Sequence, residues 1–159
     1  MHTIRLRGPW QYTPLAHTYW TEAAVSIECD TDVPAPGRLT LPSDWEPVLG
    51  KDFRGKVLFQ RQFNLPTGLH ESSIVQLSVE SVDAMATLYL NHHTLGNIAL
   101  EQSSATFEIQ QHLEPTNLLE IAVDLPTTDA HSAALPRAGR TDQQAGGITG
   151  EVQLVILEE

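Results

Sequence analysis

The acidic side chains are the first candidates for chemistry in this chain of 159 residues, which holds 20 Asp and Glu. Two carboxylates on opposite sides of a scissile bond can hydrolyse a glycoside, provided that their separation suits the retaining or the inverting mechanism. With so many acids in a small protein, some pair reaches such a separation by chance. No spacing singles out one pair, so the sequence predicts no catalytic carboxylates.

A run of three polar residues, Asn91-His92-His93, is the second candidate. Asn tolerates the positive φ that tight hairpins need, so the run favours a turn between two strands. The alternative is that Asn91 and His92 protrude at the rim of the fold and form hydrogen bonds with the hydroxyl groups of a sugar. Consecutive strand residues point to opposite faces, so His92 and His93 would chelate one metal ion poorly.

Trp45 is the aromatic residue that we expect to stack on the apolar face of a sugar ring, because its loop is bounded by Pro and Gly. The alternative is a core position, which large aromatic side chains occupy more often. Arg54 lies in the loop before a predicted strand and could contact a ligand or a partner. A solvated loop charge is the alternative for Arg54.

Metal and phosphate sites have weaker signals. Asp30 and Asp32 could supply oxygen ligands to a structural calcium ion, but two alternating acids are a weak pattern. No spacing of Cys or His matches a zinc site, and no cofactor is predicted. The pair Gly146-Gly147 lacks the Lys and Ser/Thr of a phosphate-binding loop, so it predicts a turn into a strand.

Arg61 shares one face of a predicted strand with Phe59 and Phe63. A buried arginine needs a partner, so we expect an ion pair between strands with Asp83 or Glu80. This structural role is favoured over a role in ligand binding.

The segment from Pro126 to Gly147 shows no alternation, and loops of this length are usually functional or disordered. It contains Arg137 and Arg140, the last two arginines of the chain, and the carboxylate of Asp142. Arg137 and Asp142 are therefore candidate ligand contacts. The alternative is an excursion that covers the edge of a sheet.

The formal net charge of −11 is distributed unevenly. Residues 1–70 balance, with seven Lys and Arg against seven acids, whereas residues 71–159 hold two basic residues against 13 acidic ones. Nucleic acids and anionic membrane surfaces need clustered Lys and Arg, so neither is predicted as a partner. An acidic face suits a neutral, polar or cationic ligand, and scattered charges for solubility are the plainer explanation.

The termini and the cysteine content bear on location. The first residues carry two arginines with no apolar stretch after them, which does not match a signal peptide. No run approaches the 18 apolar residues of a membrane-spanning helix. These features predict a cytoplasmic protein. Cys29 is the only cysteine, so no disulfide can form within the chain.

Strands must position these candidate residues, because period-two alternation recurs along the chain and no long helical pattern occurs. Strands are predicted around residues 25–29, 39–41, 57–63, 75–79, 84–90, 107–109, 119–125 and 152–157. About eight or nine strands in a single domain, residues 1–159, predict an all-β jelly-roll β-sandwich, in which two sheets bury their inner faces against each other.

Several phrases of the sequence have the order and spacing of a known family. They are Gly8-Pro9-Trp10, Leu41-Pro42-Ser43-Asp44-Trp45, the strand from Phe59 to Pro66, Ser81-Val82-Asp83 and the residues after it to His92, Leu95-Gly96, Asn117-Leu118-Leu119-Glu120-Ile121-Ala122-Val123, and Gly146-Gly147-Ile148. Together they resemble the N-terminal sugar-binding domain of family 2 glycoside hydrolases, which include β-galactosidases, β-glucuronidases and β-mannosidases. The resemblance runs from Gly8 to Leu154 and implies the galactose-binding-like jelly roll. The chain departs from the family at the hairpin, where Asn91-His92 stands in place of Asn-Gly.

The resemblance implies a stand-alone, non-catalytic carbohydrate-binding module, since the catalytic carboxylates of the resembled enzymes lie in a barrel that this chain lacks. Its expected partner is a neutral carbohydrate. One alternative is a protein-interaction module that docks on a glycosidase or another protein, suggested by the apolar residues Val155 and Leu157 on an outward strand face. The other is a fragment of a split or degenerate glycoside hydrolase.

Overall fold

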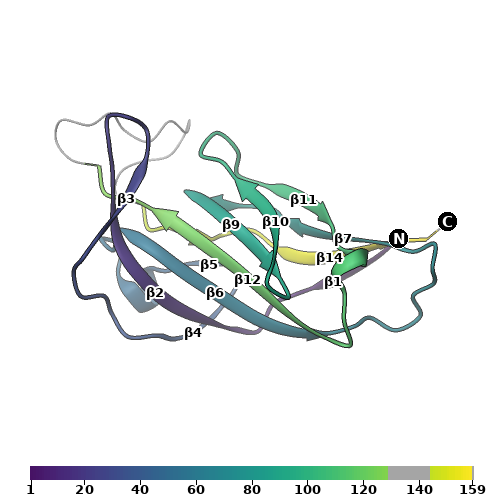
Figure 1. The fold of residues 1–159 in the computed structure, drawn as a ribbon. Helices are drawn as coiled ribbons and strands as arrows, with labels where there is room; N and C mark the ends of the chain where they lie inside the picture. Colours follow the sequence, from purple (N-terminus) through teal and green to yellow (C-terminus); the bar gives the residue numbers. More distant parts are fainter. Residues whose placement is uncertain (129–143, 159) are drawn as a thin grey trace.

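The computed structural model describes residues 1–128 and 144–158, and nearly all regular structure in them is β-strand (Figure 1). The strands are β1 (His2–Arg5), β2 (Pro9–Trp20), β3 (Ser26–Cys29), β4 (Gly37–Thr40), β5 (Ser43–Asp44), β6 (Gly55–Asn64), β7 (Ile74–Val79), β8 (Val82–Asp83), β9 (Met85–Leu90), β10 (His93–Ile98), β11 (Ala105–Glu108), β12 (Thr116–Leu125), β13 (Gly147–Ile148) and β14 (Val152–Leu157). One short helix, α1 (Glu46–Leu49), and one 3-10 turn, η1 (Gln110–His112), interrupt them. The all-β prediction is confirmed. The number of strands exceeds the expected eight or nine, partly because three of them have only two residues.

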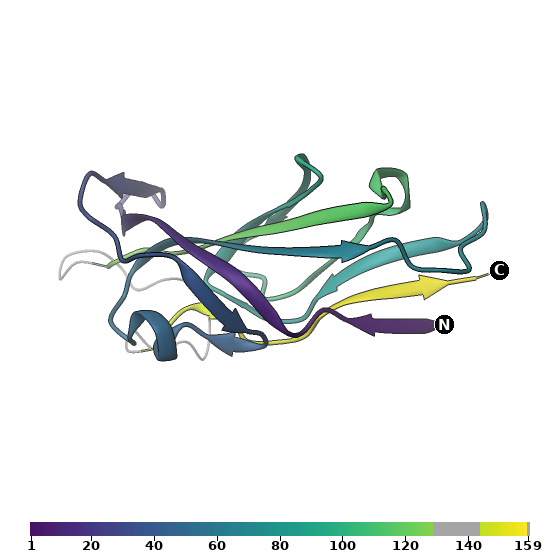
Figure 2. The same ribbon diagram turned by 90° about the horizontal axis from the view of Figure 1, so that it is seen from below.

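The strands form two layers. A four-stranded sheet has the order β1-β14-β7-β11, and a seven-stranded sheet has the order β10-β9-β12-β6-β2-β3, with β4 also paired to β2. A small sheet, β5-β13-β8, lies beside them. Figure 2 shows the layers edge on, with β1 and β14 side by side at the end where both termini lie. This is the β-sandwich expected from the sequence.

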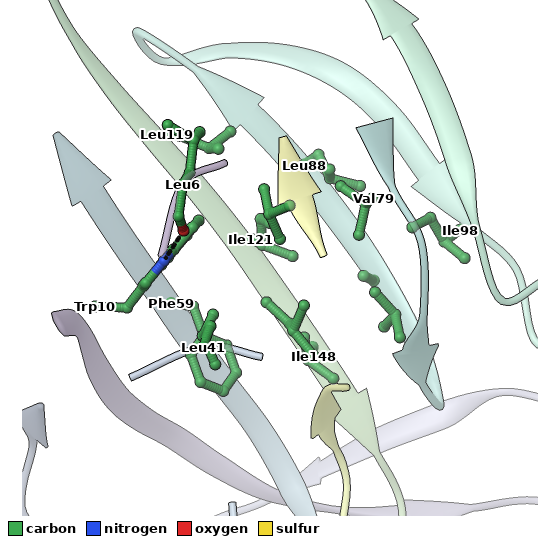
Figure 3. Packing of buried hydrophobic residues seen from close by; sticks show 14 of the residues in the cluster. Leu6, Trp10, Leu41, Phe59, Val79, Leu88, Ile98, Leu119, Ile121 and Ile148 are labelled. Atoms are coloured by element: carbon green, nitrogen blue, oxygen red, sulfur yellow. Dashed lines mark hydrogen bonds between the residues drawn. The ribbon is translucent and has the colours of Figure 1, made fainter. Parts of the chain in front are cut away.

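The core lies between the two layers, and the alternation of each strand decides which residues enter it. In β12, Leu119 and Ile121 are fully buried, and from the other layer β7 contributes Leu77 and β14 contributes Leu154, each 1% exposed. Burying one such side chain stabilises the fold by roughly 1.5–3 kcal/mol. Figure 3 shows part of this core from close by, with Leu119 and Ile121 of β12 among the labelled residues.

Trp10 carries a polar atom into this core. Its side chain is fully buried, and the indole Nε1 donates a hydrogen bond to the carbonyl oxygen of Leu6 at 2.8 Å, drawn dashed in Figure 3. A buried indole N–H needs such a partner. Trp10 therefore packs the start of β2 against the core and is not available to a ligand.

The longest strand, β2, is absent from the sequence-based expectation. Its prolines, Pro9 and Pro14, argue against a strand in the sequence, because proline cannot donate to the hydrogen-bond ladder. Pro9 is the first residue of β2, and Pro14 lies where the register with β6 shifts before Ala16. These are the two kinds of position, a strand start and a bulge, where sheets tolerate proline.

The expected ion pair of Arg61 is wrong. The Arg61 Nε donates to the carbonyl oxygen of Arg7 at 2.9 Å, and its Nη1 donates to that of Gln62 at 3.2 Å. The side chain is half-buried at the edge of the core. Backbone carbonyls therefore satisfy a charge for which the sequence predicted a carboxylate.

None of the helices in the described ranges is long and apolar enough to cross a membrane.

Candidate functional site

The register of the seven-stranded sheet places polar side chains from six strands in one line on its outer face, the face turned away from the core. We call this line the polar row. From β4 to β10 it runs through Arg38, Gln11, Gln60, Glu120, Tyr89 and Thr94. Residues opposite each other in an antiparallel pair share a face, so the row crosses five inter-strand spacings, or about 24 Å.

A second line beside the polar row has shorter or apolar side chains, and we call it the floor row. Leu58 of β6, Ala122 of β12 and Thr87 of β9 lie opposite one another, followed by Asn97 of β10. The Thr87 hydroxyl donates to Asn97 Oδ1 at 2.9 Å. Because Ala122 has no side chain beyond Cβ, the sheet is hollowed here into an open groove of about 820 Å³, lined by the floor row and by Glu120 and Tyr89 of the polar row. We call it the outer groove.

One carboxylate, that of Glu120, is held in the wall of the outer groove near Tyr89. The Gln60 Nε2 donates to Glu120 Oε2 at 3.0 Å, and the His92 Nδ1 lies 3.7 Å from Glu120 Oε1. The Glu120 side chain is only 14% exposed, so these partners fix its position. Glu120 and the Tyr89 ring lie opposite each other on adjacent strands. An aromatic ring and a fixed carboxylate therefore stand side by side.

The far end of the outer groove carries Asp124, Lys56 and Glu28. Asp124 is 7% exposed and accepts a hydrogen bond from the Thr18 hydroxyl at 2.7 Å. The Lys56 Nζ lies 3.0 Å from Glu28 Oε1. With Glu120, the described lining thus holds three carboxylates and one lysine, which suits a neutral or cationic ligand better than an anionic one.

The two best-buried carboxylates of the outer groove have widely separated positions on one strand. Glu120 and Asp124 lie four residues apart on β12, so their Cα atoms are about 13 Å apart. Retaining glycosidases place their carboxyl groups about 5 Å apart, and inverting ones up to about 9.5 Å. The backbone separation of this pair exceeds both values.

Comparison with known proteins identifies the family. A family model described as "Glycosyl hydrolase 2 galactose-binding domain-like" matches residues 44–151. The chain belongs to this family. The resemblance inferred from the sequence phrases is therefore confirmed.

Solved structures with the same fold belong to longer polypeptides. The chain is similar to a putative β-galactosidase from Bacteroides fragilis (TM-score 0.71, 19% identity, covering 99% of this chain and 23% of that one) and to a β-glucuronidase from Bifidobacterium dentium (TM-score 0.66, 21% identity, 96% and 29%). It is also similar to a rhamnosidase from Novosphingobium sp. PP1Y (TM-score 0.64, 18% identity, 99% and 15%). The chain spans less than a third of each of these proteins, and at these identities the likeness shows the fold alone. A search of curated proteins finds no match.

In this galactose-binding-like domain Trp45 is a core residue, and the expectation that its ring stacks on a sugar is corrected. It directly precedes α1, and its side chain has no exposed area. Its ring contacts the Phe53 ring edge-on, with 5.5 Å between the ring centroids. The prolines and glycines around it predict where the chain turns, but not which way the ring points. Its Nε1 is buried without a hydrogen-bond partner among the described residues.

The hairpin prediction at Asn91-His92 is confirmed, since both residues have positive φ, 50° and 69°. The Asn91 amide nitrogen donates to the carbonyl oxygen of His112 at 2.8 Å and to Asn117 Oδ1 at 2.9 Å, and Asn91 Oδ1 accepts from the Leu118 N–H at 2.9 Å. These bonds commit Asn91 to holding the turn. His92, in contrast, is 81% exposed and lines the outer groove.

The structure does not bring the remaining candidates to the outer groove. The Arg54 Nη1 donates to the carbonyl oxygens of Lys51 and Phe53 at 2.7 and 2.9 Å, so this side chain braces its own loop. Within residues 1–128 and 144–158 no group of three or more His, Cys, Asp or Glu could hold a metal ion, which leaves the calcium prediction at Asp30 and Asp32 without a third such ligand. Arg137 and Asp142 lie outside the described residues, and their ligand role stays a prediction.

Sequence reasoning missed the main residues of the outer groove, Tyr89, Thr87 and Asn97. The alternation of β12 indicates that Glu120 points away from the core. It does not indicate which residue of β9 stands opposite Glu120. Only the strand order and register, which no single strand encodes, place Tyr89 there.

Proposed function

We propose that this domain is a non-catalytic carbohydrate-binding module and that the outer groove is its sugar-binding face. The observation that carries the proposal is the position of Tyr89, a half-buried ring that stands opposite Glu120 and next to the floor row. A pyranose has an apolar face of C–H groups and a rim of hydroxyl groups. An aromatic ring suits the first, and fixed polar groups suit the second.

The polar groups of the outer groove match the rim of a neutral sugar. Glu120 and Asp124 are acceptors, Asn97 can donate through its amide, and the exposed His92 adds a ring nitrogen. Hydroxyl groups both donate and accept, so this mixture suits them. The excess of carboxylates over lysine supports a ligand without negative charge at this end of the row.

A non-catalytic role is part of the same proposal. Two observations support it. The family model that matches is the galactose-binding domain-like one, and the Cα atoms of Glu120 and Asp124 are about 13 Å apart, farther than the carboxyl groups in either hydrolytic mechanism. Substrate in the outer groove would therefore be held, while chemistry would take place on another domain or another protein.

Calorimetric titration with neutral oligosaccharides, built from galactose, glucose or mannose, tests this function. We expect at least one series to bind, and Tyr89→Ala to weaken binding tenfold or more, about 1.4 kcal/mol. The matched control is Tyr19→Ala, because Tyr19 is 42% exposed and does not line the outer groove. No binding at millimolar sugar, or an equal loss in both variants, would count against the proposal.

A docking role is the second candidate, favoured by exposed apolar side chains on the hairpin of β2 and β3. Tyr19, Val25 and Ile27 are 42%, 51% and 41% exposed, and Tyr19 pairs with Ile27. Val155 and Leu157, the residues that suggested docking from the sequence, are half-buried and do not carry it. Since the similar structures are longer glycosidase chains, the partner that we propose is a glycosidase polypeptide.

Sedimentation of the domain with a purified family 2 glycosidase that lacks its own copy tests docking. We expect a complex that Ile27→Ser abolishes and that Leu65→Ser leaves intact, because Leu65 is equally exposed, at 39%, but lies after β6. Independent sedimentation of the two proteins would contradict docking.

A further inference from the structure

The β4 end of the polar row has a chemistry opposite to that of the outer groove. A second hollow of about 590 Å³ lies there, and we call it the arginine hollow. The polar residues in its described lining are Arg38, Arg61, Gln11, Gln60 and Gln62. None of the described lining residues is acidic.

Arg38 has its charge available for a ligand. It is exposed on β4, and its side chain makes no hydrogen bond or ion pair with another residue of the described ranges. Its neighbour in the polar row is Gln11, and Gln60, whose Nε2 donates to Glu120, follows one strand farther on. A guanidinium beside an amide donor can bind an oxyanion through two parallel hydrogen bonds.

Arg61 also lines the arginine hollow, although it lies opposite Leu119 and so leaves β6 on the core side. Its Nε and Nη1 donate to carbonyl oxygens, and no carboxylate within residues 1–128 and 144–158 forms an ion pair with it. Burial lowers the pKa of Arg61, which accords with this position at the edge of the core. The exposed charge of the hollow is therefore that of Arg38.

The outer groove's carboxylates lie too far from Arg38 to cancel its charge, although Glu120 accepts a hydrogen bond from Gln60 between the two hollows. Glu120 and Arg38 are separated by three inter-strand spacings, about 14 Å. The Debye length at physiological ionic strength is about 8 Å, so their interaction is largely screened. The two ends of the polar row therefore select ligand groups independently.

We propose that the arginine hollow is the subsite for an oxyanion group on an oligosaccharide whose neutral part lies in the outer groove. The shared chemistry is that of a uronic acid carboxylate or a sulfate ester. Tyr89 and Arg38 are four inter-strand spacings apart, about 19 Å, so a monosaccharide cannot reach both. This inference rests on the proposed function, because the outer groove must hold the rest of the ligand.

Titrations with matched pairs of oligosaccharides test the subsite. One pair is a neutral tetrasaccharide that ends in a single uronic acid and the methyl ester of the same sugar, and the other is a neutral tetrasaccharide with and without a terminal sulfate ester. We expect at least one charged member to bind tenfold or more tightly than its uncharged partner. Arg38→Gln should abolish this preference, whereas Arg5→Gln, which removes an exposed charge from β1, should preserve it.

The outcomes separate the two proposals. A preference for the uronate pair, the sulfate pair or both identifies the oxyanion and supports the subsite. Equal binding of charged and uncharged members overturns the subsite and leaves the carbohydrate-binding function standing. An equal loss of preference in Arg38→Gln and Arg5→Gln also overturns it, because a general charge effect then suffices. Absence of binding by all four sugars overturns both proposals.

Discussion

The two faces of β12 differ in burial and polarity, although their residues alternate along one strand. On the inner face Leu119, Ile121 and Val123 are fully buried in the sandwich. On the outer face Glu120 and Ala122 are half-buried and belong to the polar row and the floor row. The inner residues need only to be apolar and of suitable size, whereas each outer residue depends on what stands opposite it on the next strand.

This difference separates stability from binding. Inner substitutions should change the free energy of unfolding strongly, since they leave a cavity in a close-packed core. Outer substitutions should change it little and should act on ligands instead. The largest effects are therefore expected on the inner face.

The variant Ile121→Ala tests the inner face. We expect a loss of about 3 kcal/mol in the free energy of unfolding, because it removes buried methyl groups and leaves a cavity. Urea unfolding followed by circular dichroism measures it. The matched outer variant, Glu120→Gln, keeps an acceptor for Gln60 and should lose less than about 1 kcal/mol. Equal losses would show that the two faces are not distinct.

The variant Asn91→Ala tests whether this polar residue stabilises the fold, as the apolar residues of the inner face do. We expect a loss of about 2 kcal/mol, because its three hydrogen bonds disappear and alanine is strained at φ 50°. Asn91→Gly removes the bonds but tolerates the backbone, so it should lose less. Thermal unfolding measures both. If either variant weakened sugar binding while the fold stayed intact, Asn91 would be a ligand contact after all.

The surface pair of Arg7 and Glu151 gives the smallest effect and depends on pH. The Arg7 guanidinium donates to the Glu151 carboxylate and holds the pKa of that group below its ordinary value of 4.5. The ionised carboxylate therefore stabilises the fold above pH 4.5, and this contribution is lost as the pH falls through the lowered pKa. Glu151→Gln should be slightly less stable than the wild-type protein at pH 7. The gap should close in strong acid, and a gap that widened there would contradict this account.

The sequence predicts the inner faces well and the outer face poorly. Alternation identifies β12 and β7 and the burial of Ile121 and Leu77, because each strand carries that pattern within itself. The family resemblance also follows from phrases that are local in the sequence. The turn at Asn91 is predictable for the same reason, since positive φ has a residue signature.

Non-local features escaped prediction for physical reasons. Pro14 disguised β2 because only the bulge at that position makes proline acceptable in the strand. Arg61 donates to backbone carbonyl oxygens, although the sequence predicted a carboxylate partner. The Trp45 side chain is buried in the core, although its loop predicted an exposed ring. The outer groove joins residues of at least four strands, and its register becomes known only once the sheet is assembled.

The most direct test of the central claim is a map of the residues that contact a sugar. Isotope-labelled protein titrated with the tightest-binding oligosaccharide gives this map through changes in backbone amide chemical shifts. We predict that the largest changes fall on Thr87, Tyr89, Asn97, Glu120 and Ala122. Changes confined to the loop around Trp45, or to the hairpin of β2 and β3, would contradict the assignment of the outer groove as the binding face.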